Sequence, residues 1–181
     1  MRLPTVTEIL RYFSGYDSVP KQVLEKSCHR GRSVHATCEQ IAKGHWIPDS
    51  MIKEGCLGYV NSFKQWVELF VDEFVYIEKK LSHEQLLYGG EIDYVICDLL
   101  EHKKYLVDIK TTYLPLKYHN VQISAYNELL KQNNIETEGN LLVYLDKDGE
   151  FPEIISLEDV SKEFQIFKHA LACHNYFRSN D

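Results

Sequence analysis

The chain has 181 residues, of which 44% are hydrophobic and 26% are charged, and its net charge is −7 at pH 7. This length suits one domain that can bury a core without cross-links. The acidic balance argues against a protein that coats nucleic acid through bulk electrostatics. Apolar runs stay well short of the roughly 18 residues that a membrane-spanning helix needs, so we expect no membrane partner.

Cysteine usage and the first residues bear on the compartment. The five cysteines are irregularly spaced and form no C-x-x-C pair, which predicts neither a zinc knuckle nor a disulfide framework. Residues 1–10 lack the apolar centre of a signal peptide. We therefore expect reduced thiols in a cytoplasmic protein.

Charge is distributed unevenly along the chain. Residues 1–45 hold seven Lys and Arg against four Asp and Glu, whereas residues 46–101 hold four against eleven. Residues 102–181 hold nine against twelve. The acidic centre is either a solvated surface or a set of carboxylates gathered around metal ions, with basic residues nearby for a polyanion. The composition leaves both interpretations open.

The amino-terminal third reads as helical. A short helix capped by Thr5 or Thr7 should break near residues 14–17, and Pro20 suits the first turn of a second helix. Gly31 is expected to interrupt it. Further helices are predicted over 32–43 and 59–70, with a loop over 44–58 between them.

The rest of the chain mixes strands and helices. Alternating patterns predict strands over 74–77, 92–99, 105–110 and 140–145, the middle two forming an antiparallel hairpin. Asn120 should cap a helix over 121–132, and a capping box of Ser156 and Asp159 should open a last helix ending near 177. We predict a single α/β (α+β) domain over 1–181, with a mixed sheet flanked by helices. Its helical part spans about 1–70 and its sheet with flanking helices about 71–181.

Two charges stand in the apolar strand over 105–110. Asp108 and Lys110 share a face because side chains alternate along a strand. A turn near residues 101–102 would set Asp93 opposite Lys110 and diagonal to Asp108. Carboxylates this close raise each other's pKa, and a Mg²⁺ ion would remove that cost. A plain salt bridge to Lys110 is the competing interpretation, but it leaves one carboxylate unexplained.

Two other polar positions each have an ordinary structural explanation. Gln122 and Tyr126 are four residues apart and lie on one face of a helix, where they either form an amphipathic rim or support a site. His35 follows Val34 on a predicted helix and is either a satisfied interfacial side chain or a metal ligand.

Four motifs in chain order carry a family resemblance. They are Gly31-x-x-Val34-His35, Gly90-Glu91-Ile92-Asp93, Asp108-Ile109-Lys110-Thr111-Thr112 and Gln122-x-x-x-Tyr126. This order resembles the PD-(D/E)XK nuclease superfamily, and within it the RecB-type domain of phage and repair exonucleases. The resemblance covers about residues 5–146, although the proline of the superfamily's name is absent before Asp93.

The resemblance implies a restriction-endonuclease-like core and roles for single residues. Asp93 and Asp108 would be metal carboxylates, with His35 and the backbone carbonyl of Ile109 as further ligands of one or two Mg²⁺ or Mn²⁺ ions. Lys110 would be the catalytic lysine. Supporting positions would be Glu78, Gly90, Gln122 and Tyr126. Only Cys173 lies late in the chain, so an iron–sulfur cluster of the kind some relatives carry is not expected.

The implied partner is DNA, as single strands or duplex ends. Candidate cations for its phosphates are Arg30, Arg32 and Lys43 around the His35 helix, with Lys117 and His119 before the Gln122 helix. The resemblance implies an exonuclease of recombination, repair or phage DNA metabolism, in a bacterium or a phage-infected host. The alternatives are a structure- or sequence-specific endonuclease, and a degenerate nuclease fold that only binds nucleic acid.

Overall fold

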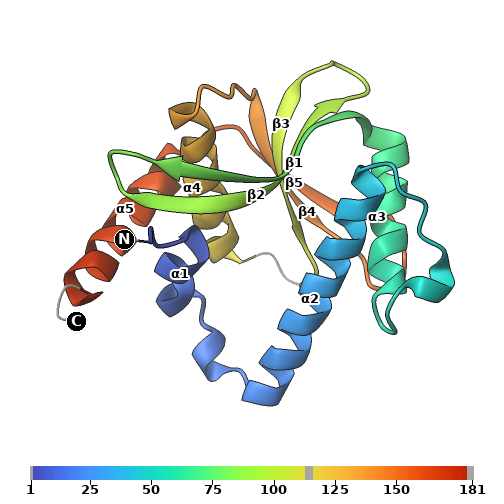
Figure 1. Cartoon of the computed structure of the whole chain (residues 1–181), viewed down its shortest axis with the longest axis horizontal. Helices are drawn as coiled ribbons and strands as arrows, with labels where there is room; N and C mark the ends of the chain where they lie inside the picture. Colours follow the sequence, from blue (N-terminus) through green and yellow to red (C-terminus); the bar gives the residue numbers. More distant parts are fainter. Residues whose placement is uncertain (1, 113–115, 179–181) are drawn as a thin grey trace.

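The computed structural model describes residues 2–112 and 116–178. Within these residues a twisted five-stranded sheet separates two groups of helices (Figure 1). The strands are β1 (Val71–His83), β2 (Tyr88–Asp98), β3 (Lys104–Lys110), β4 (Gly139–Tyr144) and β5 (Glu153–Leu157). They lie side by side in chain order, and every neighbouring pair is antiparallel except β3 and β4, which are parallel.

Helices cover both faces of the sheet. They are α1 (Val6–Leu10), α2 (Lys21–Ala42), α3 (Leu57–Phe70), α4 (Lys117–Gln132) and α5 (Ser161–Arg178), and short 3-10 turns occupy Arg11–Phe13, Tyr16–Ser18 and Asp49–Met51. One apolar core joins α1, α4 and α5 to the sheet, and a second joins α2 and α3 to the other face. None of the helices in the described part of the chain is long and apolar enough to cross a membrane.

The two faces of β3 explain how a short strand serves both cores. Val107 and Ile109 are fully buried on the α2–α3 side, and Leu106 is fully buried on the α4–α5 side. Helix α4 is the crossover that parallel pairing of β3 and β4 requires. The crossover leaves the end of β3 at Lys110 beside the first turns of α4, where the candidate site lies.

Two helix boundaries differ from the sequence-based prediction. Helix α2 runs without a break through Gly31, because one glycine costs a helix only about 1 kcal/mol. Helix α4 begins at Lys117, so Asn120 lies inside the helix and does not cap it. Local propensity was outweighed in both places by packing against the rest of the molecule.

The carboxyl-terminal prediction was wrong in one element. Ser156 belongs to β5, the edge strand that pairs with β4, and does not cap a helix. Helix α5 starts later, where the Asp159 carboxylate accepts the backbone N–H of Ser161 at 2.9 Å. Strands β1 and β2 are also longer than predicted. The expected class, a mixed sheet flanked by helices, is confirmed.

Candidate functional site

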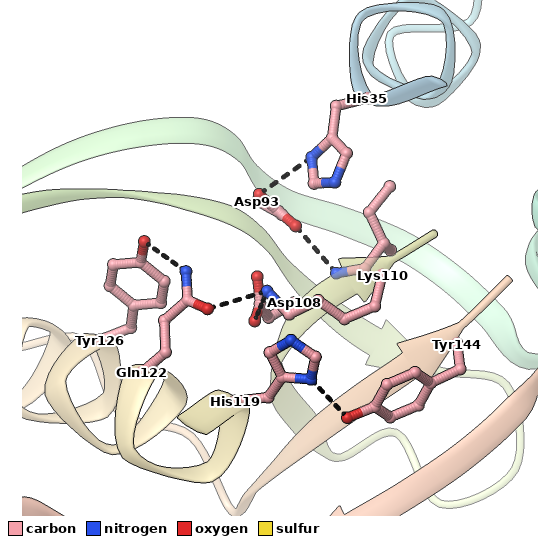
Figure 2. A network of polar contacts seen from close by, with 9 residues as sticks. His35, Asp93, Asp108, Lys110, His119, Gln122, Tyr126 and Tyr144 are labelled. Atoms are coloured by element: carbon pink, nitrogen blue, oxygen red, sulfur yellow. Dashed lines mark hydrogen bonds and ion pairs between the residues drawn. The ribbon is translucent and has the colours of Figure 1, made fainter. Parts of the chain in front are cut away.

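The site begins where β2 and β3 separate. Their pairing ends at Tyr94 and Val107, and the next residue of β2, Asp93, turns its carboxylate toward β3. Asp93 Oδ2 accepts the backbone N–H of Ile109 at 2.8 Å, so the side chain replaces a rung of the ladder (Figure 2). If the register continued by one pair, Asp93 would lie opposite Asp108. The predicted pairing of Asp93 with Lys110 was therefore wrong by two residues. The prediction that Asp93, Asp108 and Lys110 share one face of the sheet is unaffected, because side chains alternate with a period of two.

Two elements bring potential metal ligands to Asp93. His35 from α2 places Nδ1 3.4 Å from Asp93 Oδ1, and Glu78 approaches from β1. One ligand atom from each of His35, Glu78 and Asp93 lies within 4.8 Å of the others. Glu78 has a left-handed backbone with φ of 47°, which is costly for a residue with a Cβ. Strained residues of this kind collect at functional sites.

The electrostatics of these three groups are interdependent. Burial, followed by the Asp93 charge, raises the pKa of Glu78 from 4.5 to about 7. Burial opposes ionisation of Asp93, yet the neighbouring His35 lowers the net pKa of this carboxyl below its ordinary value. Burial likewise opposes a charged His35, but Asp93 raises its pKa overall. Ionisation of the buried Glu78 carboxyl is therefore unfavourable beside Asp93, and a bound cation would offset that cost.

The donor set fits a small divalent cation. Two carboxylates and one imidazole are ligands that Mn²⁺ accepts readily and that Mg²⁺ accepts through the oxygens. The sequence-based expectation gave Glu78 a supporting place and Asp108 a ligand's place. In the structure Glu78 is a member of the close group, and Asp108 is not a member of it.

Asp108 belongs to a second chain of polar contacts beside the first (Figure 2). Its Oδ2 lies 2.5 Å from Lys110 Nζ, and Lys110 Nζ donates to Gln122 Oε1 at 3.0 Å. Gln122 Nε2 in turn donates to the Tyr126 hydroxyl at 3.2 Å. The four-residue spacing on α4 thus lets Gln122 contact the lysine and Tyr126 contact Gln122.

The Asp108 carboxylate is incompletely compensated. It is 2% exposed, and its Oδ2 has no well-oriented hydrogen bond despite the ion pair with Lys110. Burial raises the pKa of Asp108 to about 6, with Lys110 lowering it and Asp93 raising it. A buried acceptor oxygen without a good donor is what a nearby cation would satisfy.

A hollow of about 400 Å³ lies beside the two groups. Its lining includes His35, Ile109, Lys110 and Gln122 from the polar network, with Tyr16, Arg30, Thr111 and Tyr118 around them. Gly90 acts from a distance: a Cβ there would lie 2.7 Å from the Tyr126 ring. Because Gly90 has no Cβ, β2 and α4 can approach closely, and the Tyr126 ring packs against the Gly90 backbone.

Three of the five candidate DNA cations, Arg32, Lys43 and Lys117, are exposed. Arg30 is half-buried, with a guanidinium nitrogen 3.4 Å from the Thr111 carbonyl and its centre 5.3 Å from the Tyr59 ring centroid. Lys43 forms an ion pair with Glu39.

His119 is not the surface cation that the sequence suggested. Its side chain is buried, and Nδ1 lies 2.9 Å from the Tyr144 hydroxyl (Figure 2). Burial, followed by the Lys110 charge, lowers the pKa of His119 to about 3, so the ring is neutral at pH 7. Tyr144, at the end of β4, was missed because its partner is 25 positions away and no local pattern joins them.

Comparisons with known proteins give a fold and no family. No protein-family model and no curated protein matches the sequence. Among solved structures, the crystal structure of SSO0001 aligns with 94% of this chain and 75% of its own, with a TM-score of 0.51 and 20% sequence identity. This chain is similar to SSO0001 in fold, and at that identity the likeness extends to nothing more.

Proposed function

We propose that this protein is a Mg²⁺- or Mn²⁺-dependent deoxyribonuclease that hydrolyses phosphodiester bonds, acting as an exonuclease on DNA ends or single strands. The observation that carries the proposal is the close group of His35, Glu78 and Asp93 beside the paired Asp108 and Lys110. The order of motifs in the sequence points to the same chemistry.

The two polar groups have complementary tasks in such a reaction. A divalent ion held by His35, Glu78 and Asp93 would supply Lewis-acid stabilisation of charge on a phosphoryl oxygen. Lys110 already makes contacts with Asp108 and Gln122, and an ammonium has three donors. Its remaining donor is available to a phosphoryl oxygen or to an attacking water, and the two contacts fix where that donor lies.

The hollow also suits a nucleic acid chain. Arg30 and Lys110 bring positive charge to its lining, and the rings of Tyr16 and Tyr118 meet edge to face with centroids 6.2 Å apart. Aromatic rings beside cations are the usual means of holding unstacked bases and their phosphates. This lining favours a single strand as the form that reaches the site.

The test compares end-labelled linear and covalently circular oligonucleotides, with Mn²⁺ and with a chelator. We expect Mn²⁺-dependent shortening of linear DNA from an end, with circular DNA left intact. Lys110→Met, which keeps the side chain's length without its charge, should be inactive, whereas Lys147→Met in the β4–β5 loop should not be. Cleavage of circular DNA would show that the enzyme is an endonuclease and not an exonuclease. Binding of DNA without cleavage in any metal would overturn the proposed activity.

A further inference from the structure

A second group of metal-ligating side chains lies at the end of the β1–β2 ladder. One ligand atom from each of Asp72, Cys97 and His102 lies within 4.8 Å of the others. Cys97 is four residues beyond Asp93 on β2, which is about 13 Å along a strand. The group is therefore separate from the candidate active site.

An irregularity in the sheet brings Asp72 to this position. Val71 pairs with Asp98 and Glu73 pairs with Cys97, so Asp72 is an additional residue on β1 between two successive pairs. Such a bulge bends the strand and redirects a side chain that would otherwise alternate away. Here the redirected carboxylate lies beside the thiol of the facing strand.

The loop between β2 and β3 is shaped so that it presents His102. Asp98 accepts backbone N–H groups from Leu100 at 3.1 Å, Glu101 at 2.9 Å and Lys103 at 2.7 Å. These bonds fold the loop around one carboxylate. His102 occupies the left-handed region, with φ of 54°, and its Nδ1 lies 3.4 Å from Asp72 Oδ2.

We propose that Asp72, Cys97 and His102 form a zinc-binding site. A thiolate, an imidazole and a carboxylate are the three kinds of ligand that Zn²⁺ takes, and the thiolate distinguishes this group from the oxygen-rich set at Asp93. Three protein ligands leave the fourth tetrahedral position to water. Asp72 and His102 are both substantially exposed, so the ion would exchange with solvent.

Bound zinc would link three segments of the chain through their side chains. These are the start of β1, the end of β2 and the loop that follows it. Glu73 and Asp98 add negative charge around the group, which favours a cation. We expect zinc to raise the melting temperature of the protein and to shield Cys97 from alkylation. This site does not depend on the proposed nuclease activity.

The test is a Co²⁺ titration of the metal-free protein in a thiol-free reductant, followed by displacement with Zn²⁺. A Co²⁺–thiolate bond gives an intense near-ultraviolet charge-transfer band, which reports cysteine ligation directly. We expect the band in the wild-type protein and its loss in Cys97→Ser. His102→Asn should weaken zinc affinity by more than about tenfold. Removing a residue that only hydrogen-bonds to a metal ligand already costs about that much affinity, and removing a ligand itself costs more. Asparagine tolerates the left-handed backbone, so that variant should fold.

Two matched variants remove the competing explanations. Cys173→Ser deletes an exposed thiol on α5, and His35→Ala deletes a ligand of the Asp93 group. Both should keep the band and the affinity. Alkylation with mass-spectrometric readout should show that zinc protects Cys97 and leaves Cys28 and Cys173 reactive. Absence of the band in the wild type, or its persistence in Cys97→Ser, would overturn the site.

Discussion

Glu78 and Asp108 lower the stability of the folded protein when no cation is bound. Both carboxyls have raised pKa values, about 7 for Glu78 and about 6 for Asp108, with burial as the main cause and Asp93 as a further one. A raised folded-state pKa means that protonation stabilises the fold. The contribution is complete below the unfolded-state pKa and is lost as the pH rises through the folded value. At pH 8 both carboxylates therefore oppose folding.

Glu78→Gln should relieve part of that cost. In metal-free buffer at pH 8 the variant should melt at a higher temperature than the wild type, and the difference should vanish near pH 4.5, where Glu78 is protonated in the folded protein. Saturating Mn²⁺ should reverse the order at pH 8, since the variant has lost a ligand. Glu84→Gln, an exposed carboxylate in the β1–β2 turn, is the control. If the melting temperatures of variant and wild type differed equally at both pH values, ionisation of Glu78 would not be the cause of the difference.

Asp108→Asn tests the second carboxylate without changing its volume. The amide loses the charge that pairs with Lys110, so the lysine keeps only Gln122 as a described partner. Cleavage should fall at least about 100-fold, the scale of losing one preorganised electrostatic group. Asp146→Asn, in the β4–β5 loop, should cleave normally. Single-turnover rates near the wild-type value in folded Asp108→Asn would place the chemistry elsewhere.

The sequence predicted these residues unequally. Alternation along one apolar strand was enough to pick out Asp108 and Lys110, because a buried strand seldom carries two charges. Glu78 was predicted only as a supporting residue, because its approach to Asp93 depends on its own left-handed backbone, which no local sequence pattern predicts. His119 was misread because the burial of a residue in the first turn of α4 is decided by β4, which lies outside that segment.

Two glycines show how elements approach one another. In β2, a Cβ on Gly90 would meet the Tyr126 ring at 2.7 Å and Leu129 at 3.1 Å. In the interior of α2, a Cβ on Gly31 would lie 3.5 Å from Thr111 Oγ1, an ordinary contact. Gly90 therefore sets the separation of β2 and α4, whereas Gly31 is a residue that α2 merely tolerates.

These positions give opposite predictions for the same substitution. Gly90→Ala should lower the free energy of unfolding by about 1–3 kcal/mol through overpacking. Gly31→Ala should raise it by about 0.5–1 kcal/mol through helix propensity and a smaller entropy of the unfolded chain. Urea unfolding of both variants measures this. A stabilised Gly90→Ala protein would mean that α4 can move away from the sheet at little cost.

At the level of elements, periodicity identified the β2–β3 hairpin and most helices. Periodicity could not identify β5, because this strand forms through its backbone pairing with the buried strand β4. It also could not extend β1 and β2, since their long outer parts are stabilised mainly by each other. The helix break expected at Gly31 and the helix cap expected at Asn120 reflect single-residue preferences that tertiary packing outweighed.

At the level of the whole molecule, a net charge of −7 must be reconciled with the polyanionic substrate that we propose. Arg32 lines the opening that His35 and Glu78 also line, and Lys117 begins α4 next to Tyr118, which lines the hollow. Binding should then depend on few phosphate contacts, with each adding about 0.9 to the log–log salt slope on duplex and about 0.7 on a single strand.

Replacing both Arg32 and Lys117 with Ala should lower that slope by about one to two units. Single-turnover cleavage at saturating DNA should stay nearly unchanged, because neither residue belongs to the polar network. Binding is measured across salt in Ca²⁺ with a labelled oligonucleotide, and Lys162→Ala with Lys168→Ala on α5 is the matched double control. If the parental slope survives in the Arg32 and Lys117 variant, DNA follows another path over the surface.

The central claim is that the Asp93 group holds the ion that cleavage requires. The most direct measurement is the single-turnover cleavage rate of a linear oligonucleotide as a function of Mn²⁺, for the wild type and for Asp93→Asn. Asparagine can still accept the Ile109 N–H, so the fold should persist. We predict a saturable Mn²⁺ dependence in the wild type and no cleavage in the variant at any Mn²⁺ concentration. Equal rates and equal Mn²⁺ dependence in the two proteins would contradict the account.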